Sequence, residues 1–233
     1  MAPQIDSMRA FIDDFQALRA SMRSERRERM AAFLSAFEIT HRRLCRERVD
    51  FNLFSLLRMG CDEVRHSQVL AWFLDAGSGH GQGTAFLRAF VELCDLDIPV
   101  EAMNRYWVRT EFSGQESIID VMVCRRREFL IYLENKVFAR EGDDQLAREF
   151  RDMRRLGASL GIPEERQFAI FLTPQAKPPL SGDPAHWRIV SYDGIAKAFG
   201  ELLPGISSGK VKGFLQDWVE TIATFGGRNG MAI

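Results

Sequence analysis

Three residues with the chemistry of a hydrolytic site, Asp120, Glu134 and Lys136, lie on two consecutive apolar segments of the chain. The segments 118–123 and 129–137 are rich in β-branched and aromatic residues, as strands are. Because side chains alternate faces along a strand, Glu134 and Lys136 share one face. If the strands pair as a hairpin about residue 127, an even register puts Asp120 on that face too. The sequence therefore predicts two carboxylates and an ammonium together at the edge of a sheet.

Such a cluster has two interpretations. Adjacent carboxylates repel, and each resists ionisation beside the other. Since burying unpaired charge is costly, a bound divalent cation such as Mg²⁺, which favours carboxylate and carbonyl oxygens, is one means of compensation. The other is an ion pair at the strand end, in which Lys136 neutralises Glu134 or Asp120 without a metal. Residue types and spacing alone leave both interpretations open.

The rest of the sequence predicts the elements that must position these residues. Helical periodicity, short β-branched segments and a glycine-rich loop follow one another after residue 50. Three consecutive strands, then a helix and two further strands, predict an α/β (α+β) fold with a mixed central sheet of about five strands flanked by helices. The expected strands are 106–112, 117–124, 129–137, 167–174 and 187–192, and the expected helices are 63–74 with Asp62 as N-cap, 84–94, 143–160, 193–203 and 210–225.

Residues 1–50 are expected to form a helical N-terminal arm, and residues 51–233 a single compact domain. Apolar residues recur at three- and four-residue steps from Met8 to Leu18 and again from Met30 to Phe37, with a polar stretch between them. The segment 22–48 holds eight Arg and four Glu, which suits either a solvated helical face or a basic arm on a phosphate backbone. The aromatic residues of the arm would suit a homodimer, or would pack on the chain's own sheet.

The composition is that of a globular protein. Its 233 residues are 46% hydrophobic and 27% charged, and 31 basic against 32 acidic residues give a net charge of −1, which argues against a polycation that coats nucleic acid. The four cysteines have no CxxC or metal-site spacing and suit a reducing cytosol. The longest apolar run, 69–74, is far short of a membrane span, and no apolar signal-peptide core follows Met1. We therefore expect a cytoplasmic protein with no membrane partner.

Motifs across residues 51–150 extend the pattern. Ile119-Asp120, thirteen residues, and then Glu134-Asn135-Lys136 lie on two consecutive strands followed by a helix. This arrangement resembles the PD-(D/E)XK nuclease superfamily, with Ile119 where the name of the superfamily has Pro. The upstream sequence is similar to one branch, in which an EvRHS-type helix precedes the catalytic strands. That likeness rests on Glu63-Val64-Arg65-His66-Ser67, Leu70–Asp75, His80-Gly81-x-Gly83, Phe86-Leu87 and Gln145-Leu146.

The resemblance implies a restriction-endonuclease-like core with a helical N-terminal extension, and it implies roles for the residues of the site. Asp120, Glu134 and the backbone carbonyl of Asn135 would bind Mg²⁺ or Mn²⁺, and Glu63 would be a further acidic ligand. Lys136 would orient the attacking water and stabilise charge on the phosphate. The reaction would be in-line attack of metal-activated water on a phosphodiester bond.

The resemblance also implies supporting roles. Gln145 would position the water or the ligands of the metal. His66 lies one helical turn after Glu63, and it is either a helix histidine hydrogen-bonded to a neighbour or, as the resemblance favours, a contact to a substrate phosphate. The adjacent Ser67 would contact the substrate as well. The tip of the hairpin carries Arg125, Arg126 and Arg127. These residues would contact a DNA backbone, unless they serve solubility alone.

Three functions follow from these patterns. The leading hypothesis is a Mg²⁺-dependent nuclease acting on DNA, in a bacterial defence or restriction system by family analogy. A second is a catalytically silent module for nucleic-acid binding or assembly on the same fold. A third is a metal hydrolase built on four histidines that lack HExxH or comparable spacing, His41, His66, His80 and His186.

Overall fold

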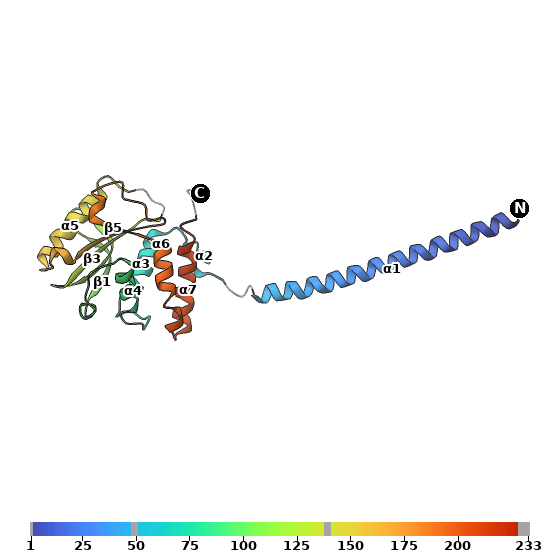
Figure 1. Ribbon diagram of the computed structural model, residues 1–233, viewed down its shortest axis with the longest axis horizontal. Coiled ribbons are helices and arrows are strands. Elements are labelled where there is room, and N and C mark those ends of the chain that lie inside the picture. The colour runs from blue at the N-terminus through green and yellow to red at the C-terminus, as the bar shows by residue number, and fades with distance from the viewer. Residues whose placement is uncertain (1, 48–50, 138–140, 228–233) are drawn as a thin grey trace. The chain divides into compact units, whose positions relative to one another are not determined.

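The computed structural model describes residues 2–47, 51–137 and 141–227, and the chain divides into two compact units, Met1–Phe51 and Asn52–Ile233. The first unit consists of one long helix, α1 (Ala2–Glu47), labelled in Figure 1. Its polar middle is helical too, because Arg and Glu are good helix formers. At 46 residues, α1 is roughly 69 Å long. Within the described ranges, neither α1 nor any other helix combines the length and apolarity that crossing a membrane requires.

The second unit is built on a five-stranded mixed sheet in which spatial order follows chain order. Three strands pair in antiparallel fashion, β1 (Trp107–Ser113), β2 (Ile118–Arg125) and β3 (Phe129–Asn135). Two more continue from β3 in parallel, β4 (Gln167–Thr173) and β5 (Trp187–Ser191). The parallel step from β3 to β4 passes through helix α5 (Gln145–Ser159), since parallel neighbours need a crossover. The predicted α/β fold with about five strands flanked by helices is confirmed.

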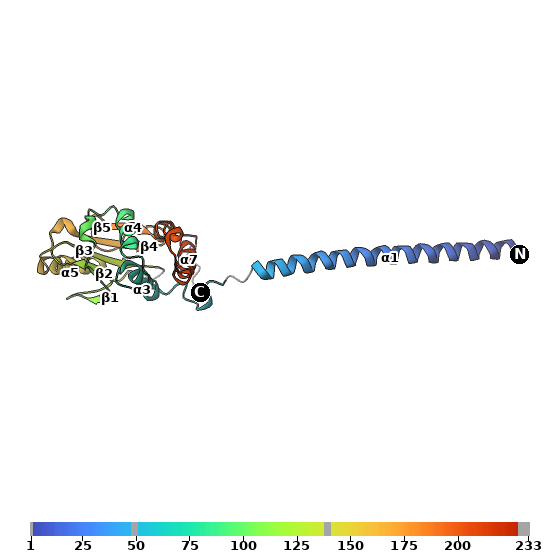
Figure 2. The same ribbon diagram turned by 90° about the horizontal axis from the view of Figure 1, so that it is seen from below.

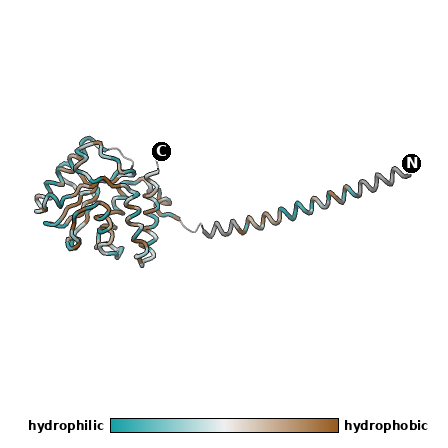
Figure 3. Tube along the Cα trace, in the orientation of Figure 1, coloured by the Kyte–Doolittle hydropathy of each residue, from teal (hydrophilic) through white to brown (hydrophobic). Residues whose placement is uncertain are grey.

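Helices cover both faces of this sheet (Figures 1 and 2). One face packs against four helices, α3 (Glu63–Leu74), α4 (Ala85–Leu93), α6 (Tyr192–Gly200) and α7 (Gly209–Ala223). The other face packs against α5, through Leu146 and Met153. All residues of β3 and β4 are buried, as the continuous apolar run at 167–174 predicts, and hydrophobic residues follow these strands in Figure 3. Short elements complete the unit, α2 (Leu53–Leu56), η1 (Val100–Ala102), η2 (Glu164–Arg166), η3 (Pro184–His186) and η4 (Leu203–Gly205).

Helix boundaries follow local capping. The Asp62 carboxylate accepts a hydrogen bond from the Arg65 N–H at 3.0 Å, so the predicted N-cap of α3 is confirmed. The Ser191 hydroxyl accepts from the Gly194 N–H at 3.0 Å and begins α6 at Tyr192. The expected strand 187–192 therefore ends one residue early, because its last residue is the first residue of a helix.

The loop between β1 and β2 is attached to α5 by a buried carboxylate. Asp152 Oδ2 accepts hydrogen bonds from the Glu116 N–H at 2.9 Å and from the Ser117 hydroxyl at 2.7 Å. A methyl group at Gly114 would overlap this carboxylate, so only glycine fits at that position. The attachment fixes the start of β2, two residues before Asp120.

Replacing Gly114 with Ala is expected to destabilise the domain by about 1–3 kcal/mol, because the new methyl group displaces Asp152 and leaves its two donors unpaired. The measurement is urea-induced unfolding followed by circular dichroism. Gly213→Ala on α7 is the matched control, since a methyl group there meets no atom within 4 Å. The control is expected to be neutral or stabilising by up to ~1 kcal/mol. Equal stabilities of the two variants would contradict the role assigned to Asp152.

Candidate active site

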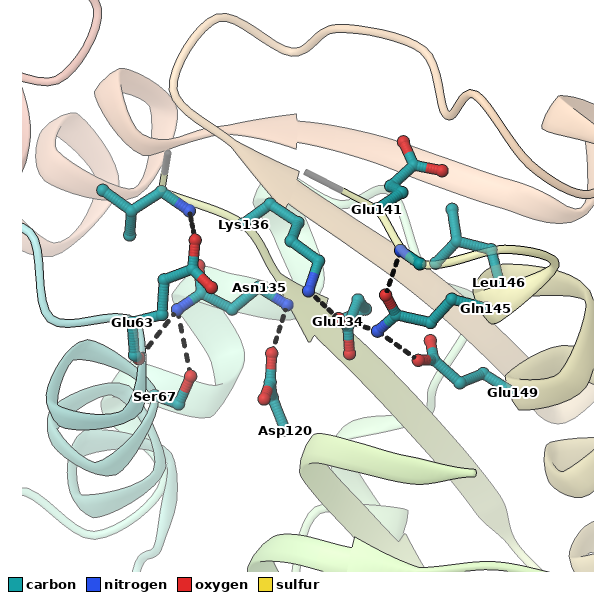
Figure 4. A network of polar contacts seen from close by, with 12 residues as sticks. Glu63, Ser67, Asp120, Glu134, Asn135, Lys136, Glu141, Gln145, Leu146 and Glu149 are labelled. Atoms are coloured by element: carbon teal, nitrogen blue, oxygen red, sulfur yellow. Dashed lines mark hydrogen bonds and ion pairs between the residues drawn. The ribbon is translucent and has the colours of Figure 1, made fainter. Parts of the chain in front are cut away.

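The paired ends of β2 and β3 bring two carboxylates together. Val121 pairs with Leu133, so the next step of the same register sets Asp120 opposite Glu134. This is the even register, and both side chains lie on the face of the sheet that α5 covers. The Asn135 N–H donates to Asp120 Oδ2 at 2.8 Å and holds that carboxylate beside the end of β3 (Figure 4).

Glu134 is almost fully enclosed, at 1% exposure. Its Oε1 accepts from Lys136 Nζ at 2.8 Å and from Gln145 Nε2 at 2.5 Å. The same Gln145 nitrogen donates to Glu149 Oε1 at 2.8 Å, so one amide links two buried carboxylates (Figure 4). The second oxygens of Glu134 and Glu149 are buried and have no hydrogen-bond partner within the described part of the chain.

Burial and mutual repulsion oppose negative charge on these groups. Desolvation raises the pKa of Asp120, although Lys136 attracts its charged form. The pKa of Glu134 is well above its ordinary value because the group is buried and faces the carboxyls of Asp120 and Glu149. Burial likewise raises the pKa of Glu149 to about 7. Burial alone would lower the pKa of Lys136, but the surrounding carboxylates, Glu134 and Glu63 first, raise it. One ammonium thus serves several carboxyl groups.

Asn135 faces the other side of the sheet and ties the end of β3 to the helices there. Its Nδ2 donates to the Ser67 hydroxyl at 2.9 Å and to the Glu63 carbonyl at 3.2 Å, and its Oδ1 accepts from the Tyr192 hydroxyl. The Glu63 carboxylate accepts from the Val137 N–H at 2.7 Å, immediately after Lys136. Ser67 is 3% exposed and therefore orients Asn135 rather than contacting a substrate.

The oxygen atoms of the site suit a hard divalent cation that takes only a few of its ligands from protein side chains. Among residues 2–47, 51–137 and 141–227, no three His, Cys, Asp or Glu side chains converge closely enough to bind a metal by themselves. Asp120 and Glu134 are nevertheless adjacent, and Glu134 has a buried oxygen to which no described residue donates. Two carboxylates completed by backbone oxygens and water are a typical Mg²⁺ environment. No histidine cluster occurs among these residues either, which leaves the histidine-based hydrolase without support in the described part of the chain.

His66 lies away from this cluster, although the sequence placed it with Glu63. It is 1% exposed, its Nδ1 accepts from Trp218 Nε1 at 3.1 Å, and its ring stacks on Phe54 at 5.9 Å between centroids. Burial lowers its pKa, so the ring is neutral at pH 7. His66 therefore joins α3 to α7 in the core, and we no longer place it among the substrate contacts.

The hairpin arginines lie at the opposite end of the strands. Arg125 donates to the Glu101 carbonyl at 2.8 Å and to Asn104 Oδ1 at 3.0 Å, whereas Arg126 and Arg127 are exposed at the tip. β3 begins beside this tip and ends at the site six residues later, roughly 20 Å away. These arginines do not line the site, and their contact with a DNA backbone stays a prediction.

Two residues of the network were missed by sequence reasoning, Glu149 and Tyr192. The sequence could have identified Glu149, because this residue follows Gln145 by four positions on a predicted helix and so shares its face. No sequence pattern identifies Tyr192, since its hydroxyl reaches Asn135 only through the packing of α6 on the sheet.

A family model of the PD-(D/E)XK nuclease superfamily matches residues 51–215, a span that includes every residue of this network. The match covers more than half of the chain, which belongs to the PD-(D/E)XK nuclease superfamily. Its members are in general nucleases, and they typically use divalent metals. No curated protein and no solved structure is significantly similar to this chain.

His66→Asn is expected to have a stability deficit that depends on pH. In the folded wild type the pKa of His66 is lowered by burial from the ordinary 6.5, so the unfolded chain takes up its proton first as the pH falls. The wild type therefore keeps this stability above about pH 6.5 and loses it below. Because the variant has no group to protonate there, the difference in free energy of unfolding should shrink from pH 8 to pH 5. A difference that stays constant in urea titrations would contradict the neutral, buried histidine.

Proposed function

We propose that this protein is a divalent-metal-dependent nuclease that hydrolyses phosphodiester bonds in DNA. The observation that carries the proposal is the convergence of Asp120, Glu134 and Lys136 at one end of the sheet, with Glu63 and Gln145 bonded around them. Phosphodiester hydrolysis needs anionic ligands for a cation and a positive group for the charge that develops on the phosphate. Membership of the superfamily supports the same chemistry.

Asp120 and Glu134 would hold Mg²⁺ or Mn²⁺, together with the backbone carbonyl of Asn135 and, directly or through water, Glu63. When bound, the metal lowers the pKa of water and neutralises negative charge on the phosphate. The chain would present its own groups in fixed positions. The Asn135 N–H holds Asp120 in place, and Lys136, restrained by Glu134, would donate to the attacking water or to a phosphate oxygen.

A groove beside the site supports a nucleic-acid substrate. It has a volume of about 500 Å³ and lies between the loop 113–118 and the start of α5. Gln145 and Glu149 line it on the side of the site, and Arg148 lines it as well, where a guanidinium suits a backbone phosphate. The likeness of α3 to the EvRHS-type helix further supports membership of that branch and a role in bacterial defence or restriction. We also propose a cytoplasmic location, since three cysteines are free thiols, Cys61, Cys94 and Cys124.

One observation favours a second function, a catalytically silent module that binds nucleic acid or assembles with partners. Lys136 and Glu134 form an ion pair at 2.8 Å, and their side chains are only 16% and 2% exposed. Such a pair neutralises one carboxylate without a metal. It leaves the carboxyl groups of Asp120 and Glu149 in place with raised pKa values, and this excess of acidic groups favours the nuclease.

Asp120→Asn, Glu134→Gln and Lys136→Met are each expected to lower the DNA cleavage rate at least ~100-fold, because each removes a group that stabilises the transition state. The assay measures cleavage of single-stranded, duplex and branched DNA and of RNA with Mg²⁺ or Mn²⁺, and EDTA should abolish it. Glu164→Gln is the control, since that carboxylate is 80% exposed and pairs only with Arg154 among its described neighbours.

Two outcomes would overturn the assignment. Cleavage that survives Glu134→Gln or EDTA would show that the site is wrong. Binding of DNA by the wild type without cleavage of any substrate under either metal would favour the silent module.

Glu149→Leu is expected to lower kcat about tenfold and leave KM unchanged, because Gln145 then loses one of the two carboxylates that orient its amide. Glu149→Gln keeps an acceptor oxygen at that position and should restore most of the rate. If both variants cleave DNA at the wild-type rate, Gln145 does not depend on Glu149.

A further inference from the structure

Six apolar residues of α1 lie symmetrically about Arg26, whereas Phe33 and Ile39 have Arg19 and Asp13 at their mirror positions. Counting outward from it in both directions, the same residue types occur at the same distances, in the pairs Met22 and Met30, Leu18 and Leu34, and Phe15 and Phe37. These six side chains are 52–64% exposed, and hydrophobic residues recur along α1 between hydrophilic ones in Figure 3. The sequence continues the spacing outward to Met8 and Leu44.

The symmetric residues form a broad stripe along one side of the helix. From Phe15 to Phe37 the stripe advances in steps of three or four residues, with Arg26 as its central member. The average is about 3.7 residues per step, close to the 3.6 residues of one helical turn. Because the four central steps are each of four residues, Leu18 and Leu34 lie about 160° apart and form the two margins of the stripe.

We propose that two copies of α1 pair in antiparallel orientation, with a two-fold axis at Arg26. In a two-fold interface, residue i of one copy meets residue j of the second, and j meets i. A stripe that reads the same in both directions satisfies this condition in one register only. That register sets Phe15 of one copy level with Phe37 of the second and Met22 level with Met30. Leu18 and Leu34 also fall at one level, on opposite margins of the seam. A helix of another protein would require no such symmetry.

The charges of α1 fit the same register. On one flank of the stripe, Glu25 of one copy falls two residues, or roughly 3 Å along the helix, from Arg29 of the second, and symmetry makes two such pairs. The two copies of Arg26 meet at the axis, where a polar residue in an apolar seam fixes register and orientation at a cost in stability, here the repulsion of two guanidinium groups. On the other flank Arg23 and Arg27 of both copies meet, so the pairing should tighten as salt screens their repulsion.

The stripe is large enough for a stable pair. Each of the six side chains is a little more than half exposed and would bury on the order of 100 Å² when covered. Two copies together would bury about 1,200 Å², which reaches the lower limit of specific protein interfaces.

Disulfide cross-linking of the full chain tests the orientation. Phe15→Cys and Phe37→Cys are made as separate proteins with tags of different length, both in a Cys45→Ser, Cys61→Ser background, because Cys61 is exposed. We expect that neither protein forms a dimer alone under oxidation and that a mixture forms the mixed dimer. Cross-linking of each protein with itself would show parallel pairing and overturn the proposal, as would the absence of cross-links in the mixture.

Light scattering with a matched pair of variants tests the interface without added cysteines. Met30→Glu places two charges in the seam and is expected to reduce the solution mass from that of two chains to that of one. Ser35→Glu adds the same charge on the exposed face opposite the stripe, and should leave a dimer. A wild type with the mass of one chain, or equal masses for the two variants, would overturn the proposal. Because this readout needs no cleavage, it is independent of the nuclease assignment.

Discussion

The alternation of side chains at the end of β3 is the constraint on which the site depends. Over three consecutive residues, Glu134 enters the layer of α5, Asn135 enters the layer of α3 and α6, and Lys136 returns to the side of Glu134. Asn135 therefore couples the reactive groups to helices that lie behind the sheet. Its amide is satisfied by Ser67 and Tyr192, while its backbone N–H restrains Asp120. A shift of one residue in the pairing of β2 and β3 would move Asp120 to the opposite face of the sheet, away from Glu134 and Lys136.

The cluster holds more buried carboxylate oxygens than donors to them, and a purely structural ion pair would not require this excess. Lys136 neutralises one buried carboxylate, yet a second oxygen of Glu134 and one of Glu149 have no donor among the described residues. Buried acceptors without donors are costly, and protein cores rarely retain them without a reason. Charge compensation by a cation, or by protonation at the raised pKa values of Glu134 and Glu149, would relieve this cost.

Sequence patterns predicted the fold more completely than the site. Alternation, apolar runs and the Asp62 cap depend on nearby residues, so they specify the five strands and the start of α3. The register at Asp120 followed only on the condition of a hairpin about residue 127 with an even pairing. His66 shows where this reasoning ends. Its spacing from Glu63 is compatible with a shared face, but which helix packs against that face is a tertiary property, and Trp218 of α7 occupies it. Tyr192 is the converse case, because a residue 57 positions from Asn135 reaches it only in the folded domain.

The order of the strands has a consequence for how the protein folds during synthesis. Every strand pairs with its neighbour in the chain, and β1, β2 and β3 can pair by closing short loops, the fast route to a β structure. The helices on the Asn135 face of the sheet assemble through contacts that are far apart in the chain, because the hydrogen bond from Trp218 to His66 joins residues 152 positions apart. A ribosome-bound chain would thus complete the hairpin of Asp120 and Glu134 well before α7 emerges to pack on α3. The orientation of Asp120, Glu134 and Lys136 would become fixed only when the last helix packs. The complete site would therefore form when synthesis of the domain is nearly finished.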